Sequence, residues 1–225
     1  MLEPVTFEEL ELAQPFPFFP LWIEKLCARY RNPEWNDYFV ARRGLTNKLQ
    51  GELVPLAQLC HHLAPDRPDS KLKYFATSSQ SFDAHVLSCN GDVQEVLEVT
   101  LACDGYRDAI ASECLKKYGW APLWTPLCYA GRRMSRDLPL PEIRSMGTKK
   151  IVEDGLALVR KAVKAKSSSG KYEGVNLVVG LEDFRFLPDQ IEDVKVELSK
   201  IQSNFKIIYY VGLDGHFFYT QFNKE

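Results

Sequence analysis

The stretch FDAHVLSCNGDVQEVLEVTLA, residues 82–102, decides the fold of this chain. Both of its halves are rich in residues that favour strands, and Asn90-Gly91-Asp92 between them is typical of a tight hairpin turn. We therefore expect two antiparallel strands, over residues 82–89 and 94–102. With a further strand over residues 72–75, they predict an antiparallel β-meander.

Side chains on a strand alternate between its two faces, so the polar residues of the hairpin can be assigned to one face or the other. Asp83 and His85 share one face of the first strand, and Phe82 belongs to the other face. On the second strand, Glu98 shares a face with Thr100, between apolar neighbours. If Asp83 and Glu98 face the same side, their charges repel each other unless a cation neutralises them or water reaches them. Oxygen ligands of this kind favour a hard divalent ion, and we expect Mg²⁺ or Mn²⁺.

The rest of the chain alternates between helical and strand patterns. Helices are expected over residues 21–30, 51–63, 104–118, 148–166 and 188–201. Two continuous apolar runs, residues 175–181 and 205–211, are typical of strands covered on both faces, and a last strand is expected over 216–222. These elements predict an α/β (α+β) fold, with a central mixed sheet that contains an antiparallel meander and is flanked by helices.

Length and composition bound the class of protein. The chain has 225 residues, of which 45% are hydrophobic, enough for one large domain. We expect a single α/β domain over residues 51–225, with a basic loop insertion around 120–147, and an N-terminal extension over residues 1–50 packed on it. There is no apolar run of about 20 residues, and the six cysteines form no Cys-x-x-Cys pair. A cytoplasmic protein with reduced, buried thiols and no membrane segment is therefore expected.

The net charge of −2 hides an uneven distribution along the chain. Residues 130–172 contain eleven basic and four acidic side chains, whereas the remainder is acidic. This segment favours contact with a polyanion, although the solvated faces of a helix and a loop would give the same count. The candidates for binding nucleic acid are Arg132, Arg133, Arg136, Lys161 and Lys166.

The order of these elements resembles the core of the PD-(D/E)xK nuclease superfamily, also called restriction-endonuclease-like. In that core a helix and a strand precede an Asp-bearing strand, a hairpin and a strand with Glu-x-Lys, and a helix and a buried strand follow. Residues 82–84 (Phe-Asp-Ala) resemble the Asp element, and residues 98–100 (Glu-Val-Thr) resemble the Glu-x-Lys element. The resemblance covers residues 50–211, with Phe82 in place of proline and Thr100 in place of lysine.

The resemblance implies metal-assisted hydrolysis of phosphodiester bonds in DNA or RNA, by an endonuclease or an exonuclease that uses Mg²⁺ or Mn²⁺. Asp83 and Glu98 would hold the metal ion. An acidic residue on the first core helix would lie nearby, and Glu52 is the candidate. Glu52 also fits a simpler role in the first turn of a helix, where the helix dipole favours an acid.

The motif lysine is the main departure from the family. Thr100 occupies its position and is counted with the catalytic residues, and a lysine from the basic helix would replace it. Lys161, Lys164 and Lys166 are the alternatives, of which Lys164 is taken as the catalytic candidate.

A second hypothesis is a catalytically inactive module with the nuclease fold, which binds nucleic acid or a protein partner. Asp83 would then be a strand-end aspartate in a turn, and Glu98 a solvent-side glutamate. Trp120 and Trp124 would stack bases or pack in a loop. The sequence leaves open whether the chain forms a homodimer.

Overall fold

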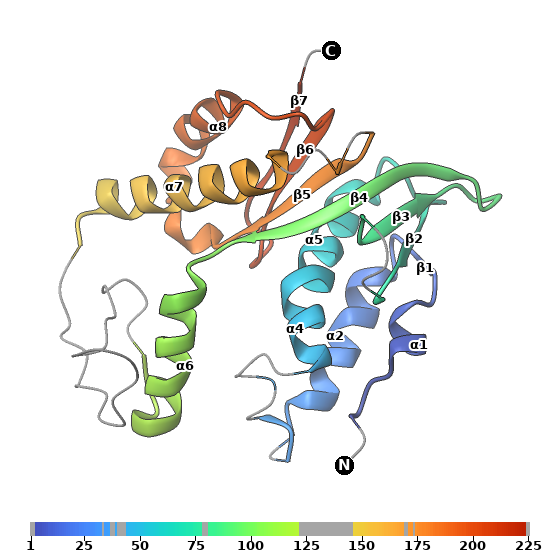
Figure 1. Ribbon diagram of the computed structural model, residues 1–225, viewed down its shortest axis with the longest axis horizontal. Helices are drawn as coiled ribbons and strands as arrows, with labels where there is room; N and C mark the ends of the chain where they lie inside the picture. Colours follow the sequence, from blue (N-terminus) through green and yellow to red (C-terminus); the bar gives the residue numbers. More distant parts are fainter. Residues whose placement is uncertain are drawn as a thin grey trace.

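The computed structural model describes residues 3–32, 34–36, 39, 44–77, 81–121, 146–168, 171–172 and 174–223. Within these ranges, seven strands form one sheet whose order follows the chain (Figure 1). The strands are β1 (Gln14–Pro15), β2 (Lys71–Tyr74), β3 (Ala84–Leu87), β4 (Val93–Ala102), β5 (Asn176–Leu181), β6 (Ile207–Gly212) and β7 (Phe218–Phe222).

Strand directions divide the sheet into two parts. Strands β1 to β4 pair antiparallel, and this confirms the predicted meander. Strand β4 then pairs parallel with β5, and β5 with β6, before β7 returns antiparallel. Parallel neighbours require crossover connections, which here contain helices. The predicted α/β class, with a mixed sheet flanked by helices, is therefore confirmed.

Helices cover both faces of the sheet (Figure 1). One face carries α2 (Phe19–Tyr30) and α5 (Val54–Leu63), and the other carries α7 (Thr148–Ser167) and α8 (Ile191–Ser199). The described chain also contains α1 (Phe7–Leu10), α4 (Leu45–Lys48), α6 (Gly105–Tyr118), a π-helical turn η1 (Leu49–Leu53) and the 3₁₀ turns η2 (Asp183–Arg185) and η3 (Pro188–Gln190).

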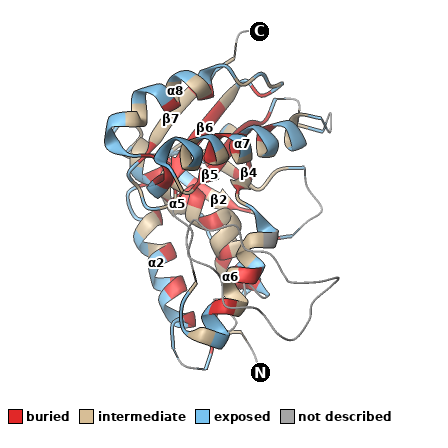
Figure 2. Cartoon of the chain, turned by 90° about the vertical axis from the view of Figure 1, so that its left-hand side faces the viewer, coloured by how far each residue is buried: buried red, intermediate tan, exposed pale blue. Residues whose placement is uncertain are grey.

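Each face of the sheet has its own apolar core. The first core joins Leu26 and Leu56 of the helices to Val86 and Val99 of the sheet. The second core joins side chains of α7 and α8 to the opposite face, including Val163. Every residue of β5 is buried, as expected for a strand with helices on both faces (Figure 2).

One helix differs from its prediction. A start at residue 51 was expected, but residues 45–63 are helical without a break, through α4, η1 and α5. The π-helical turn ends two residues before Pro55, which has no N–H to donate and would crowd a regular α-turn. Gly51 and Pro55 both weaken the helical pattern of the sequence, which explains the missed start. The expected boundary at residue 50 thus falls inside a helix.

Two further expectations concern the thiols and the membrane. No described cysteine forms a disulfide, but Cys89 is exposed at the hairpin, so the prediction that the thiols are buried is wrong there. In the described part of the chain, no helix combines the length and apolar character that crossing a membrane requires. Most of the expected basic insertion, residues 122–145, lies outside the described residues.

Candidate functional site

Strands β3 and β4 separate at Asp83, the residue that precedes β3. Its backbone still belongs to the sheet, because its N–H donates to the Leu97 carbonyl at 2.9 Å and its carbonyl accepts from the Phe75 N–H at 2.9 Å. Its side chain turns towards β4, where Oδ2 accepts a hydrogen bond from the Val99 N–H at 2.8 Å. The Asp83 carboxylate therefore takes the place of a backbone partner that a longer β3 would supply.

Glu98 lies in β4, next to Val99, and is only 5% exposed. Its neighbours Leu97 and Val99 belong to the first core, so alternation directs Glu98 to the opposite face, under α7. There the Lys166 ammonium donates a hydrogen bond to Glu98 Oε1 and forms an ion pair with it. Its burial contradicts the interpretation of Glu98 as a solvent-side glutamate.

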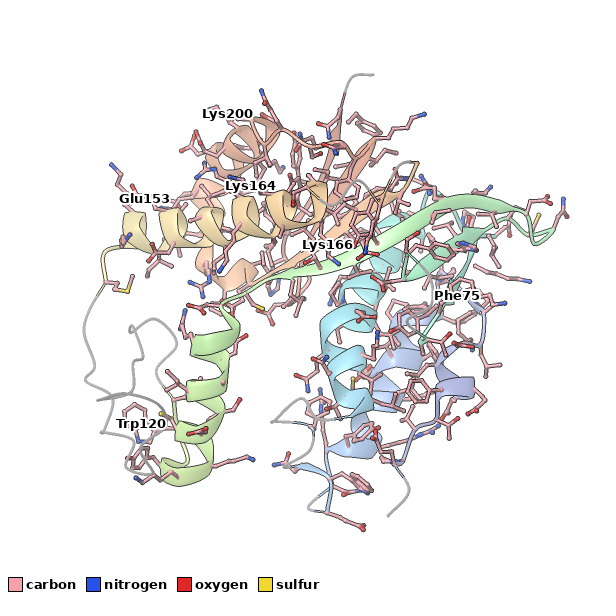
Figure 3. The ribbon with its side chains drawn as sticks, viewed as in Figure 1. Phe75, Trp120, Glu153, Lys164, Lys166 and Lys200 are labelled. Atoms are coloured by element: carbon pink, nitrogen blue, oxygen red, sulfur yellow. The ribbon has the colours of Figure 1, made fainter. Side chains whose placement is uncertain are left out.

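Lys166 lies in the last turn of α7 and reaches down to β4 (Figure 3). Its ammonium also lies over the ring of Tyr172, 5.6 Å from the centroid. Burial disfavours the charged lysine, but the hydrogen bond to Glu98 and the charges of Glu98 and Asp83 outweigh it and raise the pKa of Lys166. The site therefore contains a lysine that stays protonated.

Glu52 approaches from the π-helical turn η1. Its carboxylate accepts hydrogen bonds from Lys48 Nζ, at 3.0 and 3.2 Å, and from the hydroxyl of Tyr74. Tyr74 is fully buried, and its burial together with the Glu52 charge raises its pKa. Since Glu52 lies deep inside the helical run 45–63, its predicted alternative role in a first helical turn is wrong.

The electrostatics of Asp83 tie these groups together. Burial and the charges of Glu52 and Glu98 raise the pKa of Asp83 to about 7, against the hydrogen bond from Val99 and the charge of Lys166. A carboxylic acid with this pKa is half protonated near neutral pH, because ionising it adds another negative charge to a partly buried acidic region. We call Glu52, Asp83, Glu98 and Lys166 the carboxylate site.

Of the catalytic candidates, Asp83 and Glu98 come together, whereas Lys164 does not join them. Lys164 is exposed on α7, and Lys166, expected to bind nucleic acid, contacts Glu98 instead. Helical spacing explains the difference, because position 166 continues the buried stripe of Val159 and Val163 and position 164 lies about 100° away from it. That stripe is visible in the sequence and would have identified Lys166.

The other candidates lie outside the carboxylate site. Thr100 is half-buried in β4, two residues beyond Glu98, and Lys161 is exposed on α7. The predicted nucleic-acid-binding residues Arg132, Arg133 and Arg136 lie outside the described residues, as does Trp124. Trp120 is 37% exposed, just beyond the end of α6.

Within the described ranges, no three His, Cys, Asp or Glu side chains gather into a group that could hold a metal ion by themselves. The chain matches no family model, no curated protein and no solved structure. What the site can do chemically therefore has to follow from its own residues, which are a half-buried acid with a raised pKa, a buried carboxylate and a protonated lysine.

Proposed function

We propose that this protein is a metal-dependent nuclease of the PD-(D/E)xK type, which hydrolyses phosphodiester bonds of DNA or RNA. One observation carries the proposal: Lys166 of α7 pairs with Glu98 of β4, and its positive charge also acts on Asp83. Two carboxylates and a lysine, the residue types that the resemblance requires, thus act on one another. The lysine comes from a helix instead of position 100.

The order of the elements supports the proposal. Helix α5 precedes β2, Asp83 introduces β3, a hairpin leads to Glu98 in β4, and α7 precedes the buried strand β5. This is the sequence of elements on which the resemblance was based. A fold alone does not determine a function, so the weight rests on the carboxylate site.

The residues of the site fit a divalent metal ion. Mg²⁺ is usually bound through one or two carboxylates and keeps several waters, so Asp83 and Glu98 suffice without a third protein ligand. The raised pKa of Asp83 marks a local excess of negative charge that a cation would relieve. Glu98 has two oxygens and can keep its bond to Lys166 while it contributes to a metal site.

In this mechanism the protein positions the phosphate and neutralises its charge. A bound Mg²⁺ or Mn²⁺ would polarise the phosphate and lower the pKa of a bound water. The Lys166 ammonium, fixed by Glu98, stabilises the negative charge that grows on the phosphate in the transition state. The negative charge of Glu52 raises the pKa of Asp83 and so disfavours its ionised form when no cation is bound. A metal ion beside Asp83 would remove this penalty.

The exposed face of α7 supports a contact with the phosphate backbone. Lys161 and Lys164 lie on the same helix as Lys166 and are open to solvent. Such lysines bind phosphates without reading sequence. We propose that they guide the backbone to the carboxylate site, and the arginines at 132, 133 and 136 remain predicted contacts.

Cleavage assays test this function. Plasmid, single-stranded DNA and single-stranded RNA are incubated with the protein and Mg²⁺ or Mn²⁺, beside Glu98→Gln and the matched control Glu153→Gln on exposed α7. We expect Glu98→Gln to slow cleavage by about 100-fold or more and the control to cut at the wild-type rate. Equal rates for wild type and Glu98→Gln would exclude this site, and binding without cleavage by the wild type would favour the inactive module.

A further inference from the structure

A group of aromatic side chains lies beside the carboxylate site, on the face of β2 and β3 that points away from the first core. We call Phe75, Phe82 and His85, with Lys73, the aromatic face. The pairing of β2 with β3 brings these residues together, because Lys73 pairs with His85 and the Phe75 N–H donates to the Asp83 carbonyl. Phe75 therefore lies in the same row of the sheet as Asp83.

The three rings contact one another closely. Phe82 and His85 stack with centroids 4.5 Å apart and an interplanar angle of 24°. Phe75 meets His85 edge-on at 4.8 Å and Phe82 edge-on at 5.4 Å. The Lys73 ammonium lies 5.3 Å from the Phe75 centroid. All four residues are half-buried, so the group is partly open to solvent.

Phe82 joins this group against expectation. Strand alternation placed it on the face opposite to Asp83, but β3 begins only at Ala84, so alternation does not extend to Phe82. Its ring instead packs on the side of His85. Phe82 directly precedes Asp83 in the chain, so its ring links the aromatic face to the carboxylate site.

The position of the aromatic face is better explained by a ligand than by packing. Single exposed apolar side chains are common on protein surfaces, whereas a contiguous patch beside a charged site is typical of a binding surface. Strands β2 and β3 pack through their other face, where Tyr74, Ala84 and Val86 are buried in the first core. Helix α7 lies over β4 and β5, and Figure 3 shows Phe75 beyond it, at β2.

We propose that the aromatic face stacks an unpaired base, so that the substrate is single-stranded nucleic acid or a strand with unpaired nucleotides. This inference rests on the proposed function, because the stacked nucleotide places its phosphate at the carboxylate site. Aromatic side chains stack bases of any sequence, and in a duplex neighbouring base pairs cover the faces of each base. Lys73 supplies a positive charge for the adjacent phosphate.

His85 contributes its ring to the aromatic face between two charged groups. These are Lys73, which pairs with His85 across the strands, and Asp83, two residues away in the chain. A base stacked on the rings would therefore lie between the Lys73 ammonium and the carboxylate site.

Binding without cleavage tests the inference. Fluorescence anisotropy in EDTA compares labelled single-stranded DNA, single-stranded RNA and a blunt duplex of equal length, for the wild type and for Phe75→Leu/Phe82→Leu. Since each base stacked on an aromatic ring adds to the affinity, we expect the double variant to bind both single strands about 10-fold or more weakly and the duplex with unchanged affinity. Phe222→Leu, at the opposite edge strand β7 and 72% exposed, is the matched control.

An abasic oligomer separates stacking from charge. The wild type should bind a strand without bases as weakly as the double variant binds the normal strand. The double variant should bind the abasic strand and the normal strand with equal affinity. Wild-type affinity of the double variant for single strands, or an equal loss on the abasic strand, would overturn the inference. Thermal unfolding checks that the variants fold, and Phe82→Leu alone, outside the strands, serves if the double variant does not.

Cleavage assays on the same variants distinguish a failure of this inference from a failure of the proposed function. If Glu98 is required for cleavage but the double variant cuts single strands and duplex at wild-type rates, the aromatic face has no role and the proposed function stands. If the wild type cuts nothing yet binds single strands through Phe75 and Phe82, the proposed function fails and base stacking stands.

Discussion

At the scale of single residues, the ionised Asp83 carboxylate destabilises the folded protein. Its pKa is about 7 in the folded protein and 3.8 in the unfolded chain, so the folded state binds a proton more tightly between these values. The contribution of Asp83 to stability is therefore greatest below pH 4, falls as pH rises from 4 to 7, and is level above pH 7. Such costs are typical of functional sites.

Asp83→Asn should remove this cost. The amide keeps an oxygen for the Val99 N–H but carries no charge beside Glu52 and Glu98. We expect the variant to be more stable than the wild type at pH 8, by up to about 4 kcal/mol, and the two proteins to converge towards pH 4. Urea unfolding at several pH values measures this difference. A variant that is less stable at pH 8, or a difference independent of pH, would contradict the electrostatics of the site.

Lys166 should matter for stability and activity alike. Lys166→Met leaves the Glu98 carboxylate buried without its cation, which we expect to cost about 2 kcal/mol or more in the free energy of unfolding. Cleavage should fall by about 100-fold. Lys164→Met, on the same helix but exposed, should change the free energy of unfolding by no more than about 0.5 kcal/mol. Equal losses of stability in the two variants, measured by urea unfolding, would show that Lys166 has no special role in the fold of the site.

At the scale of elements, the close packing of the helical run 45–63 on β5 positions Glu52. Gly180 marks this contact, because a Cβ there would lie 2.7 Å from Leu101 and 2.8 Å from Pro55. We expect Gly180→Ala to destabilise the protein by about 1–3 kcal/mol. Gly51→Ala, in the helical run and with open space around it, should be neutral or stabilise by up to about 1 kcal/mol. Chemical denaturation compares them, and a neutral Gly180→Ala would contradict the packing.

Elements with a strong period were predictable from the sequence, and those under tertiary control were not. The alternation of residues 94–102 predicted the correct faces of β4, and the amphipathic pattern of residues 148–166 predicted those of α7 except at Lys166, which lies on the side of Glu98. The start of the helical run at Leu45 depends on packing that overrides Gly51 and Pro55. The contact between Glu52 and Tyr74 joins residues whose proximity only the folded chain creates.

At the scale of the whole molecule, the uneven charge of the chain should appear as salt-dependent binding. Each phosphate contact that is lost reduces the slope of log K against log salt by about 0.7 for a single strand. We expect Lys161→Ala/Lys164→Ala to reduce the slope by about 1.4, and Lys200→Ala, which removes a partner of Glu197 on the α8 side, to leave it unchanged. Anisotropy titrations at several salt concentrations measure the slopes. An unchanged slope for the double variant would exclude α7 as the phosphate-binding surface.

The central claim is that Asp83 belongs to a metal-dependent site that cuts nucleic acid. The most direct measurement is the cleavage rate of single-stranded substrate in EDTA and then in Mg²⁺ or Mn²⁺, for the wild type, Asp83→Asn and Asp92→Asn, which alters an exposed aspartate of the hairpin. We predict cleavage only with metal, lost in Asp83→Asn although this variant is folded and more stable, and kept in Asp92→Asn. Cleavage by Asp83→Asn at the wild-type rate, or cleavage in EDTA, would contradict the account.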